Sequence, residues 1–210
     1  MKKIFGNMKM RWINVILFGL LVGIYVGCIM SVPFFDGTSF QDIGISHEWW
    51  ILFALIIVVN CKKSYEAALK CFVFFLISQP VIFIVEALLG HITWELAFYY
   101  YFDIWFVRSL FTLPGGLIAY YVQKQTPIGA IVLGVGNTLE ALLGMYYGYQ
   151  ALTNFPHHLL SAIFCFIVII ITNLYIQKEK KNRIISIITT ILLIVALLVF
   201  LVLDGRVLFY

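Results

Sequence analysis

The stretch WINVILFGLLVGIYVGCIMSVPFF, residues 12–35, contains no acidic or basic side chain. A helix needs about 20 apolar residues to cross the roughly 30 Å of hydrocarbon in a bilayer. Lys2, Lys3, Lys9 and Arg11 stand before the stretch, where they would remain in water. The stretch therefore predicts a transmembrane helix.

The composition of the 210-residue chain agrees with this prediction. Hydrophobic residues make up 63 % of it and charged residues 11 %. Soluble domains have about 45–50 % apolar and about 25 % charged residues. We expect an all-α, polytopic helical membrane protein, and residues 1–210 should form a single integral membrane domain.

Six more segments are apolar enough to follow the first one across the membrane. The second, around 49–61, is short by itself and is expected to begin earlier, near Ile43 or Ile45. The others are 69–89, 93–122, 127–147, 156–176 and 184–203. The sequence thus predicts about seven transmembrane helices, with six as the alternative.

The basic residues predict the orientation, because loops on the cytoplasmic side collect Lys and Arg. With the N-terminus inside and seven crossings, only Arg108 and Arg206 of the fourteen cations avoid the inner side. The C-terminus would then lie outside, and Trp49, Trp50 and Trp94 would belong to an outer aromatic belt. The inner cations are Lys2, Lys3, Lys9, Arg11, Lys62, Lys63, Lys70, Lys124, Lys178, Lys180, Lys181 and Arg183.

This charge distribution also bears on partners and location. The net charge of +4 is explained by orientation and by attraction to anionic lipid headgroups, so membrane lipid is an expected partner. No basic domain outside the bilayer is predicted, which argues against nucleic acid. The composition of the sequence, rich in Lys, Ile and Phe, is typical of a bacterial inner membrane protein.

A stripe of small residues, Gly19, Gly23 and Gly27, lies on one face of the first predicted helix. Small residues at a spacing of four let two helix backbones approach closely. The stripe could pack against a helix of the same chain. Alternatively, it could dock a helix of a partner membrane subunit.

Five polar side chains inside the apolar segments form the candidate ligand-binding site: Glu86, Asp103, Arg108, Asn137 and Glu140. A charge at the bilayer centre costs about 2.5–3.5 kcal/mol, so such residues face the protein interior and pair with one another. Asp103 and Arg108 are about 140° apart on an ideal helix and are poor partners. We therefore expect Arg108 to pair with an acidic residue of another helix, preferably Glu140, with Glu86 as the alternative.

Two features of the backbone leave alternatives open. Residues 91–103 could form a separate interfacial or re-entrant helix, which would bring Asp103 to the membrane surface. Gln79–Pro80 and Pro114–Gly115–Gly116 could interrupt their helices, and broken helices at membrane depth line binding sites in transporters. Each could equally be a simple kink.

No metal site or cofactor is predicted. The chain has no CxxC pair, and His47, His91, His157 and His158 lack the HExxH or HxxxH spacing of a zinc site. Three functions remain open. The first is binding or transport of a small solute through a polar site open to the outer face. The second is a non-catalytic accessory, immunity or assembly subunit, and the third is an intramembrane enzyme acting on a lipid or isoprenoid.

Overall fold

The computed structural model of the chain describes residues 10–42 and 47–203, and every regular element in these ranges is a helix. Side chains in these helices are mostly apolar all round, as expected of helices that are covered by lipid or by other helices. The predicted all-α fold class is confirmed. The predicted start of the second segment, and Lys2, Lys3, Lys9 and Arg206, lie outside the described residues.

Five helices are long and apolar enough to cross a membrane: α1 (Trp12–Ser31), α4 (Ser64–Leu88), the composite helix Trp94–Gln123, α8 (Pro127–Thr153) and α10 (Lys180–Leu203). Two more apolar helices, α3 (His47–Val58) and α9 (Leu159–Tyr175), are shorter. The 12 residues of α3 extend only about 18 Å. The chain is thus a multi-pass membrane protein, but the count of seven spans is not confirmed.

The composite helix Trp94–Gln123 changes its winding along its length. It consists of α5 (Trp94–Tyr99), the π-helical η2 (Tyr100–Trp105), α6 (Phe106–Leu110), α7 (Thr112–Ala119) and the 3-10 turn η3 (Tyr120–Gln123). Thr93 caps its start, because its hydroxyl accepts a hydrogen bond from the Leu96 amide at 3.3 Å. Since α5 continues into η2 and α6 without a loop, residues 94–103 form the first part of this long helix.

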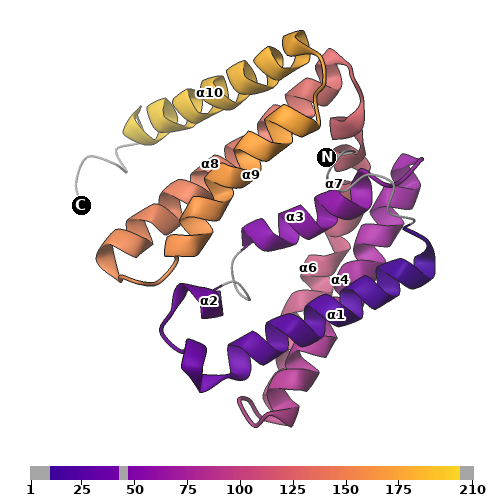
Figure 1. Ribbon diagram of the computed structural model, residues 1–210, viewed down its shortest axis with the longest axis vertical. Coiled ribbons are helices and arrows are strands. Elements are labelled where there is room, and N and C mark those ends of the chain that lie inside the picture. Colours follow the sequence, from indigo (N-terminus) through magenta and orange to yellow (C-terminus); the bar gives the residue numbers. More distant parts are fainter. Residues whose placement is uncertain (1–9, 43–46, 204–210) are drawn as a thin grey trace.

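The helices form two groups with α3 between them (Figure 1). In one group α4 contacts α1 on one side and α7 on another. In the other, α8 packs against both α9 and α10. The short helix α3 touches α4, α7, α8 and α9, so it joins the two groups near the middle of the molecule.

Glycines bring α1 close to α4. A Cβ atom added at Gly23 would lie 2.7 Å from the Ser78 carbonyl oxygen, and one at Gly27 would lie 2.9 Å from that of Ile82. The face of α1 that carries Gly19, Gly23 and Gly27 is therefore covered by α4 of the same chain. A partner subunit bound to these glycines stays a prediction, and it would have to displace α4.

Pro80 does not break its helix, whereas the composite helix changes from α6 to α7 at Phe111, three residues before Pro114. Pro80 lies inside α4, which continues for two more turns, and Pro114 lies in the first turn of α7. Gly116 serves close packing, since a Cβ atom there would lie 2.7 Å from Cα of Ala68 in α4.

Hydrogen bonds tie the loops together at one end of the molecule. Gln177 donates to the carbonyl of Val122 at 2.8 Å, and Gln123 reaches the Cys61 carbonyl at 3.3 Å. Arg183 donates to the Gln177 carbonyl at 2.8 Å, and the Tyr120 hydroxyl donates to the Lys62 carbonyl. The loops and the start of α10 thus meet at one end, which we call the cationic end and which carries Lys62, Lys63, Lys124, Lys178, Lys180, Lys181 and Arg183. This agrees with the sequence-based orientation.

The opposite end is closed by a small cap that follows α1. The cap contains the 3-10 turn η1 (Pro33–Phe35) and α2 (Ser39–Asp42). The Asp42 carboxylate accepts a hydrogen bond of 2.6 Å from the His158 amide, and the Ser39 hydroxyl accepts one of 2.9 Å from the Leu159 amide. The cap therefore holds the loop between α8 and α9 from the side of α1.

Candidate functional site

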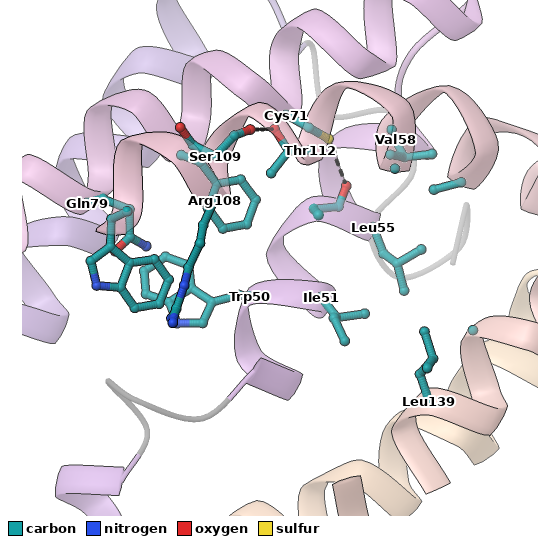
Figure 2. A pocket seen from close by; sticks show the side chains of 17 residues that line it. Trp50, Ile51, Leu55, Val58, Cys71, Gln79, Arg108, Ser109, Thr112 and Leu139 are labelled. Carbon is teal, nitrogen blue, oxygen red and sulfur yellow. Dashed lines mark hydrogen bonds between the residues drawn. The ribbon is translucent and has the colours of Figure 1, made fainter. Parts of the chain in front are cut away.

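A cavity of about 440 Å³ lies between α3, α4, the α6–α7 part of the composite helix and α8. Figure 2 shows Arg108, Gln79 and Trp50 gathered at one end of it, with Ile51, Leu55, Val58 and Leu139 further along. The full lining comprises Trp50, Ile51, Ala54, Leu55, Val58, Cys71, Phe75, Gln79, Trp105, Arg108, Ser109, Thr112, Gly115, Gly116, Ala119, Gly136 and Leu139.

Arg108 supplies the only charge among the described residues of this lining. It stands halfway along the composite helix, and its guanidinium lies 4.9 Å from the centre of the Trp105 ring. Within the described part of the chain no carboxylate forms an ion pair with it, so the expected pair with Glu140 is not present. The guanidinium is left with an aromatic face and unused hydrogen-bond donors.

Two buried donors lie beside Arg108. The side chain of Gln79 is 2 % exposed and that of Trp50 is 6 % exposed. Neither Nε2 of Gln79 nor Nε1 of Trp50 has a hydrogen-bond partner. A buried donor without a partner costs about 1–3 kcal/mol, so a ligand that accepts these bonds would recover this energy.

The remaining polar side chains of the lining are already used by the backbone. Ser109 donates to the carbonyl of Phe106 at 2.7 Å, and Thr112 donates to that of Ser109 at 2.6 Å. The described lining contains no Asp or Glu. One end of the cavity is therefore rich in donors and positive, and the rest is apolar.

Glycines make room in the cavity. A Cβ atom at Gly115 or at Gly136 would meet no other atom within 4 Å, and both residues line the cavity. Their absent side chains leave open space on the α7 wall and on the α8 wall. The small size of Gly115 in the Pro114–Gly115–Gly116 motif thus contributes space to the site.

The π-helical turn η2 precedes Arg108 by one turn of helix. The Phe106 amide donates to the Tyr101 carbonyl, five residues earlier, which is the hydrogen bond of a π-helix. Such a turn rotates the residues after it relative to those before it, and π-helical turns are frequent at functional sites. Asp103 lies within this turn, is exposed, and does not line the cavity.

The five predicted site residues do not converge on one point. Arg108 lines the cavity, whereas Glu86 is buried on α4 outside it. Asn137 and Glu140 share the face of α8 that is turned to α9, where Asn137 accepts a hydrogen bond of 2.9 Å from Thr172. The residues of α8 in the cavity are the neighbours Gly136 and Leu139.

Sequence reasoning misses Trp50 and Glu48. The tryptophans at 49 and 50 are typical of an aromatic belt, but Trp50 is buried against Phe74 and Phe75, and Trp49 stacks on Phe164 with ring centres 3.8 Å apart. Glu48, directly before the apolar run at 49–61, is not among the predicted site residues, and the structure buries it completely. The shortness of the apolar run at 49–61 is the available signal, because it allows a helix that begins inside the membrane.

The described residues contain no group of three or more His, Cys, Asp or Glu side chains that could hold a metal ion. His157 and His158 instead lie against the single carboxylate of Asp42, at 3.4 and 3.8 Å.

Comparisons with protein-family models, with curated proteins and with solved structures find no match to this chain. Function must therefore be inferred from the cavity itself.

Proposed function

We propose that this membrane protein binds an amphipathic molecule with an anionic headgroup, such as a carboxylate or a phosphate. The headgroup would lie at Arg108, Gln79 and Trp50, and the apolar part would lie along α3 and α7. The observation that carries the proposal is an unpaired guanidinium at mid-helix depth that lines an apolar cavity without a described carboxylate.

The chemistry of the guanidinium favours an anion. Arginine stays charged in proteins, and its planar donors fit a carboxylate or phosphate with two parallel hydrogen bonds. A bound anion would compensate a charge that otherwise costs about 2.5–3.5 kcal/mol at the bilayer centre. Gln79 on α4 and Trp50 on α3 would add two donors at the same end of the cavity.

The size of the cavity fits a small molecule. Ligand pockets have volumes of about 300–1,000 Å³ and are mostly apolar with a few polar groups. The observed 440 Å³, with the unused donors of three side chains at one end, belongs to this range. Ile51, Leu55 and Leu139 would contact the apolar part of the ligand.

The position of the cavity suggests how a ligand enters. From Arg108 the lining continues through Gly116 and Ala119 on α7 and to Val58 on α3, which is next to the cationic end. If the N-terminus lies on the cytoplasmic side of a bacterial cell membrane, the half of the cavity between Arg108 and Val58 faces the cytoplasm. The proposed site thus differs from the outer-facing pocket expected from the sequence. A protein that binds a molecule at this site could also transport it across the membrane.

The experiment compares ligands that share a tail. Dodecylsulfonate and dodecyltrimethylammonium would be titrated, below their micellar concentrations, into the purified protein in nanodiscs, with tryptophan fluorescence as the readout. We expect saturable binding of the sulfonate only. We expect Arg108→Gln to weaken it by about ten- to a hundredfold, since hydrogen bonds to charged groups contribute about 1.5–3 kcal/mol.

Two matched glycine variants test whether the ligand binds in the cavity. Gly136→Leu would fill the cavity, whereas Gly148→Leu adds the same side chain to the same helix outside the cavity, where a Cβ atom also meets nothing within 4 Å. Loss of sulfonate binding in Gly136→Leu with normal binding in Gly148→Leu is expected. Equal binding of both ligands by the wild type, or unchanged binding in Arg108→Gln, would contradict the proposal.

A further inference from the structure

Two buried carboxylates lie in the same region of the protein, outside the cavity. Glu48 in the first turn of α3 is 0 % exposed, and Glu140 on α8 is 2 % exposed. None of their four carboxylate oxygens has a nitrogen or oxygen donor as a hydrogen-bond partner. Trp49, the neighbour of Glu48 in the chain, stacks on Phe164 of α9. Cys165 of α9 lies against α8, where a Cβ atom at Gly144, one turn after Glu140, would be 3.0 Å from the Cys165 Cβ atom. The two carboxylates therefore lie in one region between α3, α8 and α9.

The surroundings of the pair offer no compensating charge among the described side chains. The titratable group that faces it from α9 is the thiol of Cys165, which is fully buried beside Glu140. Asn137, one turn along the same face of α8, is also buried, and its Nδ2 has no hydrogen-bond partner. No described Lys or Arg forms an ion pair with either carboxylate.

Two ionised carboxylates cannot share such a place. Burial disfavours the charged form of a carboxyl group, and a second negative charge nearby disfavours it further. A proton taken up by one carboxyl gives it a hydrogen bond donor, which the other carboxylate can accept. With one proton and one negative charge, the two carboxyl groups can then form a hydrogen bond with each other.

We propose that Glu48 and Glu140 form a proton-binding site that is separate from the Arg108 cavity and coupled to it. The coupling rests on the proposed function and on two shared helices. Trp50 and Ile51 on α3, and Leu139 on α8, line the cavity and are within three residues of the two glutamates in the chain. Loss of the shared proton leaves two like charges, which push the start of α3 away from α8 and so open this wall of the cavity.

The direction of the coupling follows from this geometry. The protonated pair holds α3 against α8 and keeps the cavity closed around its ligand. Affinity for an anionic amphiphile should therefore fall as the pH rises through the range in which the pair releases its proton. Binding of the ligand should in turn favour proton uptake, because coupling between two sites is reciprocal.

The proton itself can be detected without any ligand. Infrared difference spectra of the full-length protein in nanodiscs, recorded between acidic and alkaline pH, would show the carbonyl band of a protonated carboxyl. We expect Glu48→Gln and Glu140→Gln to remove the same band, because both residues hold the same proton. Glu86→Gln is the control, since Glu86 is also buried but lies on α4, and this variant should retain the band.

Two further tests, one with a variant and one with sodium ions, distinguish the proposed proton site from its alternatives. His47→Gln tests the residue next to Glu48 in the chain and should leave the carboxyl band in place. Survival of the band in both glutamine variants that fold normally would overturn the proton site. Loss of the band on adding sodium at constant pH would overturn it as well, in favour of a site for a metal cation.

The coupling is tested with dodecylsulfonate, whose charge does not change between acidic and alkaline pH. Wild-type affinity should fall by at least about tenfold from acidic to alkaline pH, and it should be nearly constant in Glu140→Gln. If the sulfonate binds at no pH, the proposed function fails while the infrared result still decides the proton site. If it binds with the same pH dependence in the wild type and in Glu140→Gln, the coupling fails while the proposed function stands.

Discussion

At the scale of single residues, the protein holds two buried glutamines in opposite situations. Gln79 lies at the cavity with an unpaired Nε2. Gln177, at the cationic end, donates to the carbonyls of Val122 and Lys124 at 2.8 and 3.2 Å. In our proposal, the side chain of Gln79 thus binds a ligand, whereas the side chain of Gln177 stabilises the fold.

This contrast gives a prediction for two matched substitutions. Gln79→Leu removes a donor that has no partner, so we expect thermal stability in the absence of ligand to stay the same or to rise, and sulfonate binding to weaken. Gln177→Leu leaves two carbonyl groups without a donor, so we expect a loss of about 1–3 kcal/mol. Thermal unfolding of both variants in the same detergent measures the difference. A larger loss in Gln79→Leu than in Gln177→Leu would show that Gln79 is structural.

Sequence reasoning at this scale finds the unusual charge but not its neighbours. Arg108 stands out because a cation inside an apolar run is rare. Trp50 and Gln79 do not stand out, because a tryptophan near a segment end and a glutamine before a proline have common structural explanations. Their importance depends on the way α3 packs against α4, and the spacing within either segment carries no signal of that contact.

At the scale of the elements, the close contact between α1 and α4 depends on residues that have no side chain. Gly23 is the tightest point, because its missing Cβ would approach Ser78 and Val81 to within 2.7 and 2.8 Å. In a bilayer, helix packing gains little from the hydrophobic effect and relies on close backbone approach.

We expect Gly23→Leu to destabilise the protein by about 1–3 kcal/mol or more, because the added atoms force the two backbones apart. Gly148→Leu has open space around its Cβ position and should change stability little. Chemical or thermal unfolding in nanodiscs compares the two. Normal stability of Gly23→Leu would mean that α1 and α4 are not in contact as described.

The long helices can be predicted from the sequence, whereas the depth of the short helix α3 cannot. The apolar runs at 12–35, 69–89 and 184–203 correspond to α1, α4 and α10 because an uninterrupted run allows one structure in lipid, a helix. The run at 49–61 is too short to specify its own depth. Its position depends on contacts of α3 with four other helices, so the burial of Glu48 cannot be predicted from this run alone.

At the scale of the whole molecule, charge separates the two ends. Lysines and arginines gather where the loops after α3, η3 and α9 meet, and the opposite end carries Asp42 with His157 and His158. This asymmetry can be predicted by counting residues alone, since the rule for loops does not depend on how the helices pack. The meeting of these loops at one end is visible only in the fold.

The orientation can be measured with introduced cysteines in a variant without the four native ones. Asn154→Cys and Lys181→Cys place an exposed thiol at opposite ends. In intact bacterial cells, a maleimide that cannot cross the membrane should label Asn154→Cys and should reach Lys181→Cys only after the cells are opened. The reverse pattern would contradict the orientation and the inner position of the cavity.

The native thiol at the cationic end allows a related prediction. Cys61 is 5 % exposed, and burial raises its pKa to about 11. Because the thiolate is the reactive form, the Cys61 thiol should react slowly with maleimide at pH 8, even in opened cells, and faster as the pH approaches 11. Rapid labelling of wild-type Cys61 at pH 8, identified by peptide mass spectrometry, would show that this end is open.

The π-helical turn Tyr100–Trp105 contains one residue more than an α-helical path through the same space would need. Deleting a single residue there would restore ordinary α-helical winding while the turns on both sides keep their positions, because the π-helical turn accommodates the extra residue locally. A variant with one residue fewer would therefore keep both Arg108 and the aromatic rings of the segment 94–99 in place. The turn thus allows this helix to carry an additional residue without moving either of its halves.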